Sequence, residues 1–209
     1  MIRLFDYWRS SASYRVRIAL ALKHVAYERI AVNLLGAEQL GDENRARNPQ
    51  GQVPTLEVDG VALIQSLAII DWLDHAFPEP RLIPEAPIER ARALAQALLI
   101  AADIHPIDNM RVLKRLEAQF GADQGAREDW YRHWMAIGFD ALEALAGDGP
   151  YLGGAAPTIA DLCLVPQMYN ARRFALPLDR YPRLVAADAA AQALPGFAAA
   201  HPDRVKPAG

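Results

Sequence analysis

Residues 2–33, IRLFDYWRSSASYRVRIALALKHVAYERIAVN, hold the pattern that decides the fold of the first part of the chain. The segment 2–7 alternates in hydrophobicity as a short strand does, and the segment 27–33 is predicted to form a second strand. Between them, apolar residues recur at helical spacing from Val16 to Leu22, and the serines at 10, 11 and 13 can cap that helix. Strand, helix and strand in this order predict the start of a parallel sheet.

The next segment predicts a hairpin followed by a second helix. Residues 53–58 have the pattern of a short strand, Asp59-Gly60 is a strong hairpin signal, and residues 61–64 are expected to return antiparallel. Ser66 is expected to cap a helix whose apolar residues recur up to Phe77. The first part of the chain is therefore predicted to be an α/β domain.

Beyond this segment the pattern changes. Residues 79–87 contain three prolines and are interpreted as a linker, and no strand pattern follows Ile88. We expect an α/β domain over residues 1–81 and an all-α domain over residues 88–209. The predicted helical segments of the second domain are 88–120, 126–146, 158–174 and 182–199.

The composition is that of a globular protein, with 52% hydrophobic and 22% charged residues and a net charge of −3. No run of basic residues supports binding to nucleic acid, and no stretch of about 18 apolar residues predicts a membrane span. The first residues lack the apolar segment of a secretory signal. Cys163 is the only cysteine and cannot form an intramolecular disulfide, so a reducing cytoplasm is the expected compartment. The five histidines and this cysteine show no metal-ligand spacing, and no metal is expected.

The serines after the first strand stand where a redox enzyme with this strand–helix unit carries C-x-x-C. Ser10 and Ser13 occupy the two cysteine positions, which excludes disulfide exchange at this site. What remains is a group of hydroxyls at a helix N-terminus, where N–H groups without helical partners and the helix dipole stabilise a bound thiolate. The alternative is that these serines only cap the helix.

Two further segments suit a peptide-like ligand. Val53-Pro54 follows a glycine-containing turn, and a cis peptide bond there would turn the Val53 backbone outward as an edge for peptide pairing. Gln65 can hydrogen-bond an amide or a carboxylate, and the helix N-terminus at Ser66 can receive a carboxylate.

Together and in this order, these segments resemble the zeta class of glutathione transferases, which includes maleylacetoacetate isomerases and bacterial maleylpyruvate isomerases. Residues 9–20, RSSASYRVRIAL, resemble the zeta motif around the active-site serine. Residues 52–56, QVPTL, resemble the cis-proline segment that holds the cysteinyl backbone of glutathione, and residues 65–70, QSLAII, resemble the segment that binds its γ-glutamyl end. The resemblance continues in the second half through residues 161–167 and 171–174. It implies a thioredoxin-like first domain, an all-α second domain, glutathione as cofactor and a homodimer.

The resemblance also implies roles for individual residues. Ser10 is implied to be the hydroxyl nearest the glutathione sulfur, with Ser11 as its neighbour, and Ala12 stands where the family often has a cysteine. The predicted catalytic residues are Ser10, Ser11, Arg9 and Arg173. The residues predicted to bind glutathione are Ser10, Ser11, Gln39, Gln52, Val53, Gln65, Ser66, His105, Asn109 and Arg111.

Residues 103–111, DIHPIDNMR, form the most informative helical stretch. Pro106 is expected to kink or interrupt the helix, while His105 and Asn109, four residues apart, would share one face. One interpretation is a kinked core helix with a solvated polar side. The resemblance instead places His105, Asn109 and Arg111 near the pocket for glutathione and substrate.

Arginines supply the charge that a dicarboxylic substrate requires, because guanidinium groups bind carboxylates bidentately. Arg9, Arg111 and Arg173, from distant parts of the chain, are the candidates. Arg15 and Arg17 lie in the first predicted helix and are alternatively structural ion-pair partners.

Two features of the second domain are interpreted as structural. Residues 158–161, TIAD, form a capping box with aspartate in the usual place of Glu or Gln, so Asp161 is not predicted to be catalytic. Cys163 stands among apolar residues and is expected to be a small buried hydrophobe rather than a nucleophile.

The resemblance implies glutathione-dependent cis–trans isomerisation of maleylacetoacetate or maleylpyruvate, a step in the catabolism of aromatic compounds. Addition of a thiolate turns the conjugated double bond into a single bond, and rotation followed by loss of the thiol gives the trans isomer. Two other hypotheses stay open. One is a transferase that conjugates or dehalogenates small electrophiles such as haloacids, and the other is a non-catalytic binding module on the same fold.

Overall fold

The structure is a computed structural model and describes residues 1–207. These residues divide into two compact units. The first comprises residues 1–82 together with the tail from residue 193, and the second comprises residues 83–192.

The first unit is built on a four-stranded mixed sheet with the order β2-β1-β3-β4. β1 (Ile2–Asp6) pairs in parallel with β2 (Glu28–Ala31), while β3 (Thr55–Val58) runs antiparallel to both β1 and β4 (Val61–Ile64). The predicted strand–helix–strand unit and the hairpin at Asp59-Gly60 are thus confirmed.

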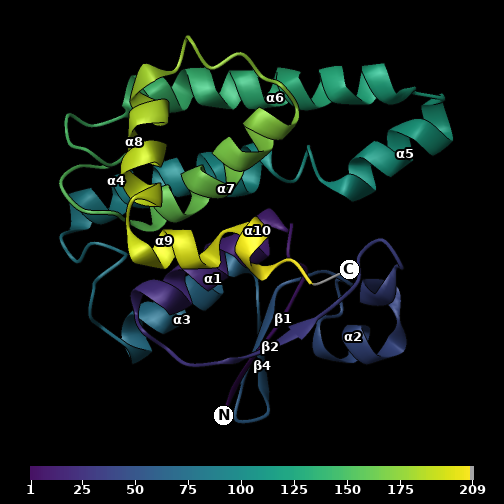
Figure 1. Ribbon diagram of the computed structural model, residues 1–209, viewed down its shortest axis with the longest axis horizontal. Helices are drawn as coiled ribbons and strands as arrows, with labels where there is room; N and C mark the ends of the chain where they lie inside the picture. Colours follow the sequence, from purple (N-terminus) through teal and green to yellow (C-terminus); the bar gives the residue numbers. More distant parts are fainter. Residues whose placement is uncertain (208–209) are drawn as a thin grey trace. The chain divides into compact units, whose positions relative to one another are not determined.

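Two helices cover the sheet and pack against each other, as Figure 1 shows. In the chain, α1 (Ser11–Leu22) connects β1 to β2, and α3 (Ser66–Ala76) follows β4. The apolar core of this unit includes Leu4 and Leu56 from the sheet, Ile18 from α1 and Ile70 from α3, all fully buried. Burial of such side chains from water is the main favourable contribution to folding.

One short helical segment was not predicted. A 3₁₀ turn at Glu38–Leu40 and α2 (Asp42–Arg47) lie between β2 and β3. The segment is polar and lacks helical apolar periodicity. Asp42 and Glu43 in its first turn and Arg45 and Arg47 in its last turn match the helix dipole instead.

Two buried carboxylates of the first unit, Asp6 and Asp74, are paired with cations. The Asp6 carboxylate lies between two guanidinium groups, 2.5 Å from Arg17 Nη1 and 2.7 Å from Arg29 Nε. Lys23 Nζ lies 2.8 Å from Asp74 Oδ1. Arg17 is therefore a structural ion-pair partner, as one of the two interpretations of the sequence held, because a buried charge must be compensated.

The tail differs from the predicted division, which assigned all of residues 88–209 to the second domain. α9 (Pro195–Ala200) packs against α1 of the first unit, with Phe197 fully buried. Gly196 lies so close to α1 that a Cβ atom there would come within 2.8 Å of Leu22 Cδ2. The predicted helix over 182–199 is correspondingly split into α8 (Pro182–Gln192) and α9, with Pro195 at the first turn of α9. A last short helix, α10 (Pro202–Val205), follows.

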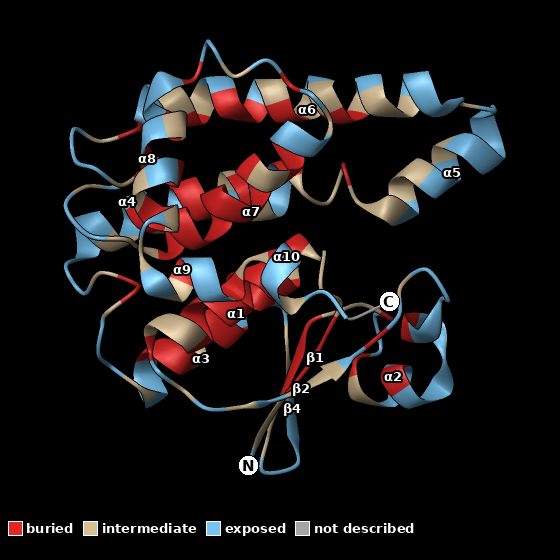
Figure 2. Ribbon diagram, viewed as in Figure 1, coloured by how far each residue is buried: buried red, intermediate tan, exposed pale blue. Residues whose placement is uncertain are grey.

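The second unit is entirely helical. Its helices are α4 (Pro87–Leu98), a π-helix at Leu99–Ile104, α5 (Met110–Phe120), α6 (Gln124–Leu145), α7 (Ile159–Arg173) and α8. α7 packs against α4, α8 and the π-helix, and Figure 2 shows it buried along most of its length. No helix in residues 1–207 is both long and apolar enough to cross a membrane.

The predicted helical segment 88–120 is interrupted where Pro106 stands. The backbone passes from the π-helix into turns at residues 105–109 before α5 begins. Proline cannot continue a helical hydrogen-bond ladder, so the predicted interruption is confirmed. His105 and Asn109 are not on one continuous helix, and their four-residue spacing does not place them on a shared helical face.

Candidate active site

Strand pairing brings segments that are distant in sequence to one end of the sheet. Phe5 of β1 pairs with Thr55, the first residue of β3, and Thr55 pairs with Ile64, the last residue of β4. Asp6, the last residue of β1, pairs with Ala31, the last residue of β2. The same end therefore carries the predicted site segments that begin or end these strands, namely residues 7–11, 32–39, 52–54 and 65–66. Ligands of α/β sheets bind at the carboxyl ends of parallel strands, which for β1 and β2 is this end.

Ser10 caps α1. Its Oγ accepts a hydrogen bond from Ser13 N at 3.3 Å, and its extended backbone (φ −68°, ψ 123°) is that of an N-cap residue. The hydroxyl hydrogen can still be donated to an anion, because a serine hydroxyl both donates and accepts. The helix N-terminus adds N–H groups and a positive dipole end that stabilise a thiolate. Ser11 begins the helix and is 8% exposed, whereas Ser13 is fully buried.

The residues around β3 and β4 are arranged beside one another. The Val53-Pro54 peptide bond is cis. Gln65 Nε2 donates to Gln50 Oε1 at 2.7 Å, and Gln65 has a positive φ of 70° that a non-glycine residue seldom adopts. Gln65, not Ser66, is the N-cap residue of α3, and its side chain makes no capping bond. The expected cap at Ser66 is thus shifted by one residue, because Ser66 already belongs to the helix.

A buried arginine links the two helix N-termini. Arg15 Nη1, from α1, donates to Ser66 Oγ at 3.3 Å, and Arg15 is only 2% exposed. The guanidinium places a positive charge behind the N-terminus of α3. It adds to the field of that helix and favours a carboxylate in front of it.

Gln39 and Gln52 flank the same end of the sheet. Gln39 lies in the 3₁₀ turn with 9% exposure, and its Oε1 makes no hydrogen bond within residues 1–207. Asn44 Nδ2 holds this loop by donating to Gln39 O at 3.0 Å. Asn48 Nδ2 donates to Gln52 O at 3.0 Å, which fixes the backbone just before Val53. A buried amide oxygen without a partner normally finds one in water or a ligand.

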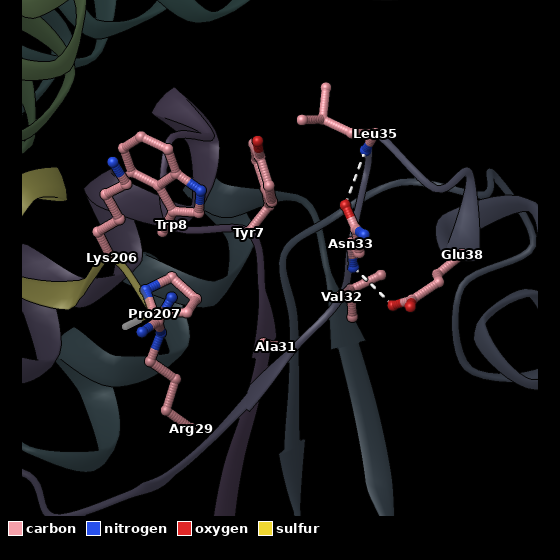
Figure 3. A pocket seen from close by; sticks show the side chains of 10 residues that line it. All are labelled: Tyr7, Trp8, Arg29, Ala31, Val32, Asn33, Leu35, Glu38, Lys206 and Pro207. Atoms are coloured by element: carbon pink, nitrogen blue, oxygen red, sulfur yellow. Dashed lines mark hydrogen bonds between the residues drawn. The ribbon is translucent and has the colours of Figure 1, made fainter. Parts of the chain in front are cut away.

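A cavity of about 380 Å³ lies at the ends of β1 and β2 (Figure 3). Its size is in the range of small-molecule sites. Tyr7 and Trp8 line it and directly precede Arg9 and Ser10. The Arg9 guanidinium carbon lies 5.3 Å from the centroid of the Trp8 ring. The other lining residues are Arg29, Ala31, Val32, Asn33, Leu35, Glu38, Lys206 and Pro207.

In the second unit, the remaining predicted glutathione-binding residues flank the break between the π-helix and α5. His105 follows the π-helix, and its backbone N–H donates to Ile100 O at 2.9 Å. Asn109 caps α5, with Oδ1 accepting from Arg111 N at 3.1 Å. Arg111 is exposed in the first turn of α5. The three residues thus flank the turn at 105–109, and the capping hydrogen bond joins Asn109 to Arg111.

Asp108 lies in the same turn and was not predicted. It is 2% exposed, and neither carboxylate oxygen makes a hydrogen bond within residues 1–207. Burial raises the pKa of Asp108 to about 8, since the charged carboxylate loses its hydration. A carboxyl in this environment is protonated at neutral pH. The sequence signal was the alternation of polar residues around Pro106, which does not reveal which of them turns inward.

Arg173, the predicted catalytic arginine of this unit, ends α7. Its Nη1 donates to Asn170 Oδ1 at 3.2 Å, and its guanidinium carbon lies 4.8 Å from the centroid of the Phe174 ring. The residue is exposed, so its charge faces solvent and not the core.

The capping box at residues 158–161 and the burial of Cys163 are confirmed. Asp161 is fully buried and accepts hydrogen bonds from Thr158 N and Leu152 N, each at 2.8 Å. Burial raises the pKa of Asp161, and these hydrogen bonds oppose the rise. Cys163 is fully buried in α7. Within residues 1–207 no group of three or more His, Cys, Asp or Glu side chains is arranged to hold a metal ion.

The two parts of the chain each match a family model. Residues 4–81 match the N-terminal domain of glutathione S-transferases, and residues 110–187 match the C-terminal domain. The chain belongs to the glutathione transferase family. The α/β first unit and the helical second unit of this transferase agree with that assignment.

Relatives and solved structures resemble this transferase over almost its whole length. The maleylacetoacetate isomerase of Rhizobium meliloti (strain 1021) is 46% identical over 207 residues, which are 98% of this chain and 97% of that protein. A solved maleylpyruvate isomerase, described as a bacterial glutathione S-transferase of the zeta class, has a TM-score of 0.96 and 44% identity, covering 99% of this chain and 100% of its own. The resemblance to the zeta class is therefore confirmed.

A third protein has been solved with ligands. The maleylacetoacetate isomerase of Anaeromyxobacter dehalogenans 2CP-1, with glutathione bound in its active site, has a TM-score of 0.90 and 46% identity, covering 100% of this transferase and 98% of that chain. Another structure of the same isomerase holds dicarboxyethyl glutathione and citrate in the active site.

Proposed function

We propose that this transferase is a glutathione-dependent cis–trans isomerase of a maleyl-type dicarboxylate, with maleylacetoacetate and maleylpyruvate as the candidate substrates. The observation that carries the proposal is the position of Ser10. Its hydroxyl caps α1 at the end of the sheet where the Val53-Pro54 and Gln65-Ser66 segments and the cavity of Figure 3 also lie. The isomerases that this chain resembles at 44–46% identity support the same reaction.

The residues present fit glutathione as the cofactor. A tripeptide with two carboxylates and a thiol needs a partner for each of these groups. The N-terminus of α3, with Arg15 behind it, suits a carboxylate, and the buried Gln39 Oε1 has no hydrogen bond within residues 1–207 and suits an N–H donor. Ser10 and the N-terminus of α1 suit the thiol. Gln52, Val53 and Gln65 would hold the peptide backbone between these groups.

When bound, glutathione would supply a thiolate nucleophile, whose reversible addition would turn the conjugated double bond into a rotatable single bond. The chain's own residues carry out the rest. Ser10, with Ser11 beside it, donates a hydrogen bond at the sulfur position and keeps the thiol ionised. Arg9 and Arg173 bind the carboxylates of the substrate and offset the negative charge that develops on its carbonyl oxygen. His105, Asn109 and Arg111 are the residues of the second unit that we assign to glutathione binding.

The same family likeness supports two further proposals. We infer that the enzyme is a homodimer, which light scattering on the purified protein tests directly. We also infer that it acts in the cytoplasm, in agreement with a single buried cysteine that forms no disulfide within the chain.

Isomerase assays test the function. Purified protein is mixed with maleylpyruvate or maleylacetoacetate, each with and without glutathione, and formation of the trans isomer is followed by absorbance. Turnover that requires glutathione is the expected result, and the ratio of kcat/KM identifies the better substrate. Glutathione binding without turnover of either compound would contradict the proposal and favour conjugation or dehalogenation of small electrophiles such as haloacids.

A further inference from the structure

The cavity beside Tyr7 and Trp8 is walled on one side by the C-terminal tail, and successive contacts fix that tail to the first unit. Arg17 Nε, from α1, donates to Ala200 O at 3.2 Å at the end of α9. The His201 ring lies edge-on to Tyr14, with ring centroids 6.0 Å apart, and its Nδ1 accepts from Asp203 N at 3.3 Å. These contacts hold the tail up to the start of α10.

Arg29 makes the last of these contacts, at the cavity itself. Its Nη1 donates to Val205 O, while its Nε lies 2.7 Å from Asp6 Oδ1. The side chain of Arg29 therefore serves to tether the tail and to pair with Asp6. Because Val205 is held in this way, the next residue, Lys206, is placed at the cavity wall (Figure 3).

The Lys206 ammonium lies beside an aromatic ring that a second cation also approaches. Lys206 Nζ is 5.4 Å from the centroid of the Trp8 ring, and the Arg9 guanidinium carbon is 5.3 Å from the same centroid. Two positive charges from opposite ends of the chain thus lie beside one indole. A cation–π contact at an exposed site is worth only about 0.5–1 kcal/mol, so a carboxylate can displace it.

The other charged groups of the cavity already have partners. Glu38 Oε2 accepts from Asn33 N at 2.6 Å, and Arg29 is held by Asp6 and Val205. For Lys206, residues 1–207 provide the Trp8 ring and no ion pair. Arg17 and Arg29 also share the single Asp6 carboxylate. Together with Lys206 these cations outnumber the carboxylates of Asp6 and Glu38, so the cavity and its surroundings keep a net positive charge. The field in the cavity favours an anion.

We propose that Lys206 determines specificity for the dicarboxylate substrate by binding one of its carboxylates while Arg9 holds the other. Arg29 positions the tail that carries Lys206. The inference rests on the proposed function, because it assigns the acceptor of that site. It adds a residue that sequence patterns do not indicate, since an exposed lysine near residue 206 belongs to no motif. The compact ammonium with three donors suits a carboxylate that approaches from the solvent side.

The test compares Lys206→Met, which keeps most of the aliphatic side chain and removes the charge, with Arg204→Met. Arg204 is exposed on α10 and does not line the cavity. Its substitution removes one positive charge from the same tail. Calorimetric titration of the glutathione-loaded protein with succinate, a non-reacting dicarboxylate, measures binding without turnover. Steady-state kinetics give KM for the dicarboxylate substrate and for glutathione separately.

Lys206→Met is expected to weaken succinate binding and to raise KM for the dicarboxylate, each about fivefold, as for a partly exposed ion pair. KM for glutathione should not change, Arg204→Met should behave as the wild type, and Lys206→Arg should restore most of the loss. Equal effects of Lys206→Met and Arg204→Met, an equal rise in KM for glutathione, or no succinate binding to the wild type would overturn the assignment. If the wild type binds succinate but isomerises neither maleylpyruvate nor maleylacetoacetate, the proposed reaction fails. The succinate titrations still measure the role of Lys206.

Discussion

The sheet end in the first unit and the turn at residues 105–109 in the second unit hold their predicted site residues by different means. At the sheet end, strand pairing, a capped helix and a short run of hydrogen bonds fix Ser10, Gln65 and Ser66. In the turn, a proline breaks the helix, and His105 and Asp108 lie outside regular elements, while Asn109 caps the helix that follows. The first arrangement follows from backbone geometry, whereas the second depends on which side chain is buried.

The largest effect, a change in the free energy of unfolding, is expected at Asp108 in the turn at residues 105–109. Its pKa is about 8 in the folded protein, against about 3.9 in an unfolded chain. Between these values the folded state holds a proton that the unfolded state has lost. The free energy of unfolding therefore falls as pH rises from about 4 to about 8, and this contribution is constant above that.

Asp108→Asn removes this dependence. The variant is expected to gain stability relative to the wild type as pH rises, by up to a few kcal/mol at pH 8, at about 1.4 kcal/mol per pKa unit. Urea unfolding of both proteins at pH 5, 7 and 9 measures the difference. Asp103→Asn, at an exposed position of the π-helix, is the matched control. Parallel stability curves for Asp108→Asn and the wild type would show that Asp108 titrates normally, and the contrast between the two regions would be lost.

The second effect concerns Ser10, at the sheet end of the first unit. In Ser10→Ala the thiol of bound glutathione loses a hydrogen-bond donor, so its pKa should rise and kcat should fall on the order of a hundredfold. Ultraviolet titration of the thiolate measures the pKa, and stopped-flow kinetics measure turnover. Ser13→Ala is the matched control, because the Ser13 hydroxyl is fully buried on the same helix turn and makes no hydrogen bond within residues 1–207.

Ser11→Ala ranks the two neighbouring serines. Ser11 begins α1 and is nearly buried, whereas Ser10 accepts the capping bond. A thiolate pKa that moves in Ser11→Ala and stays constant in Ser10→Ala would transfer the activating role to Ser11.

The sheet end could be predicted from the sequence because its signals are local, whereas contacts between distant segments leave no such signal. Serines at a helix start, a Gly-containing turn before Val53-Pro54 and an Asp-Gly hairpin are local signals, and strand pairing brings them together once the sheet forms. The cavity wall at Lys206 could not be predicted, because it requires a tail that returns across the whole chain to α1. The inward position of Asp108 likewise depends on how the break at Pro106 is resolved in three dimensions, which spacing alone does not specify.

The smallest of these effects is expected at Arg173, the exposed cation of the second unit. Arg173→Ala removes a guanidinium that the proposal assigns to a substrate carboxylate, so KM for the dicarboxylate should rise about tenfold while KM for glutathione stays constant. Arg173→Lys keeps a charge but not the bidentate fork and should recover only part of the loss. The guanidinium also contacts Asn170 and the Phe174 ring, so unfolding of each variant must be measured beside its kinetics. Equal losses for both substrates together with lower stability would assign Arg173 to the fold of α7, and would leave substrate recognition to the arginine and lysine beside Trp8.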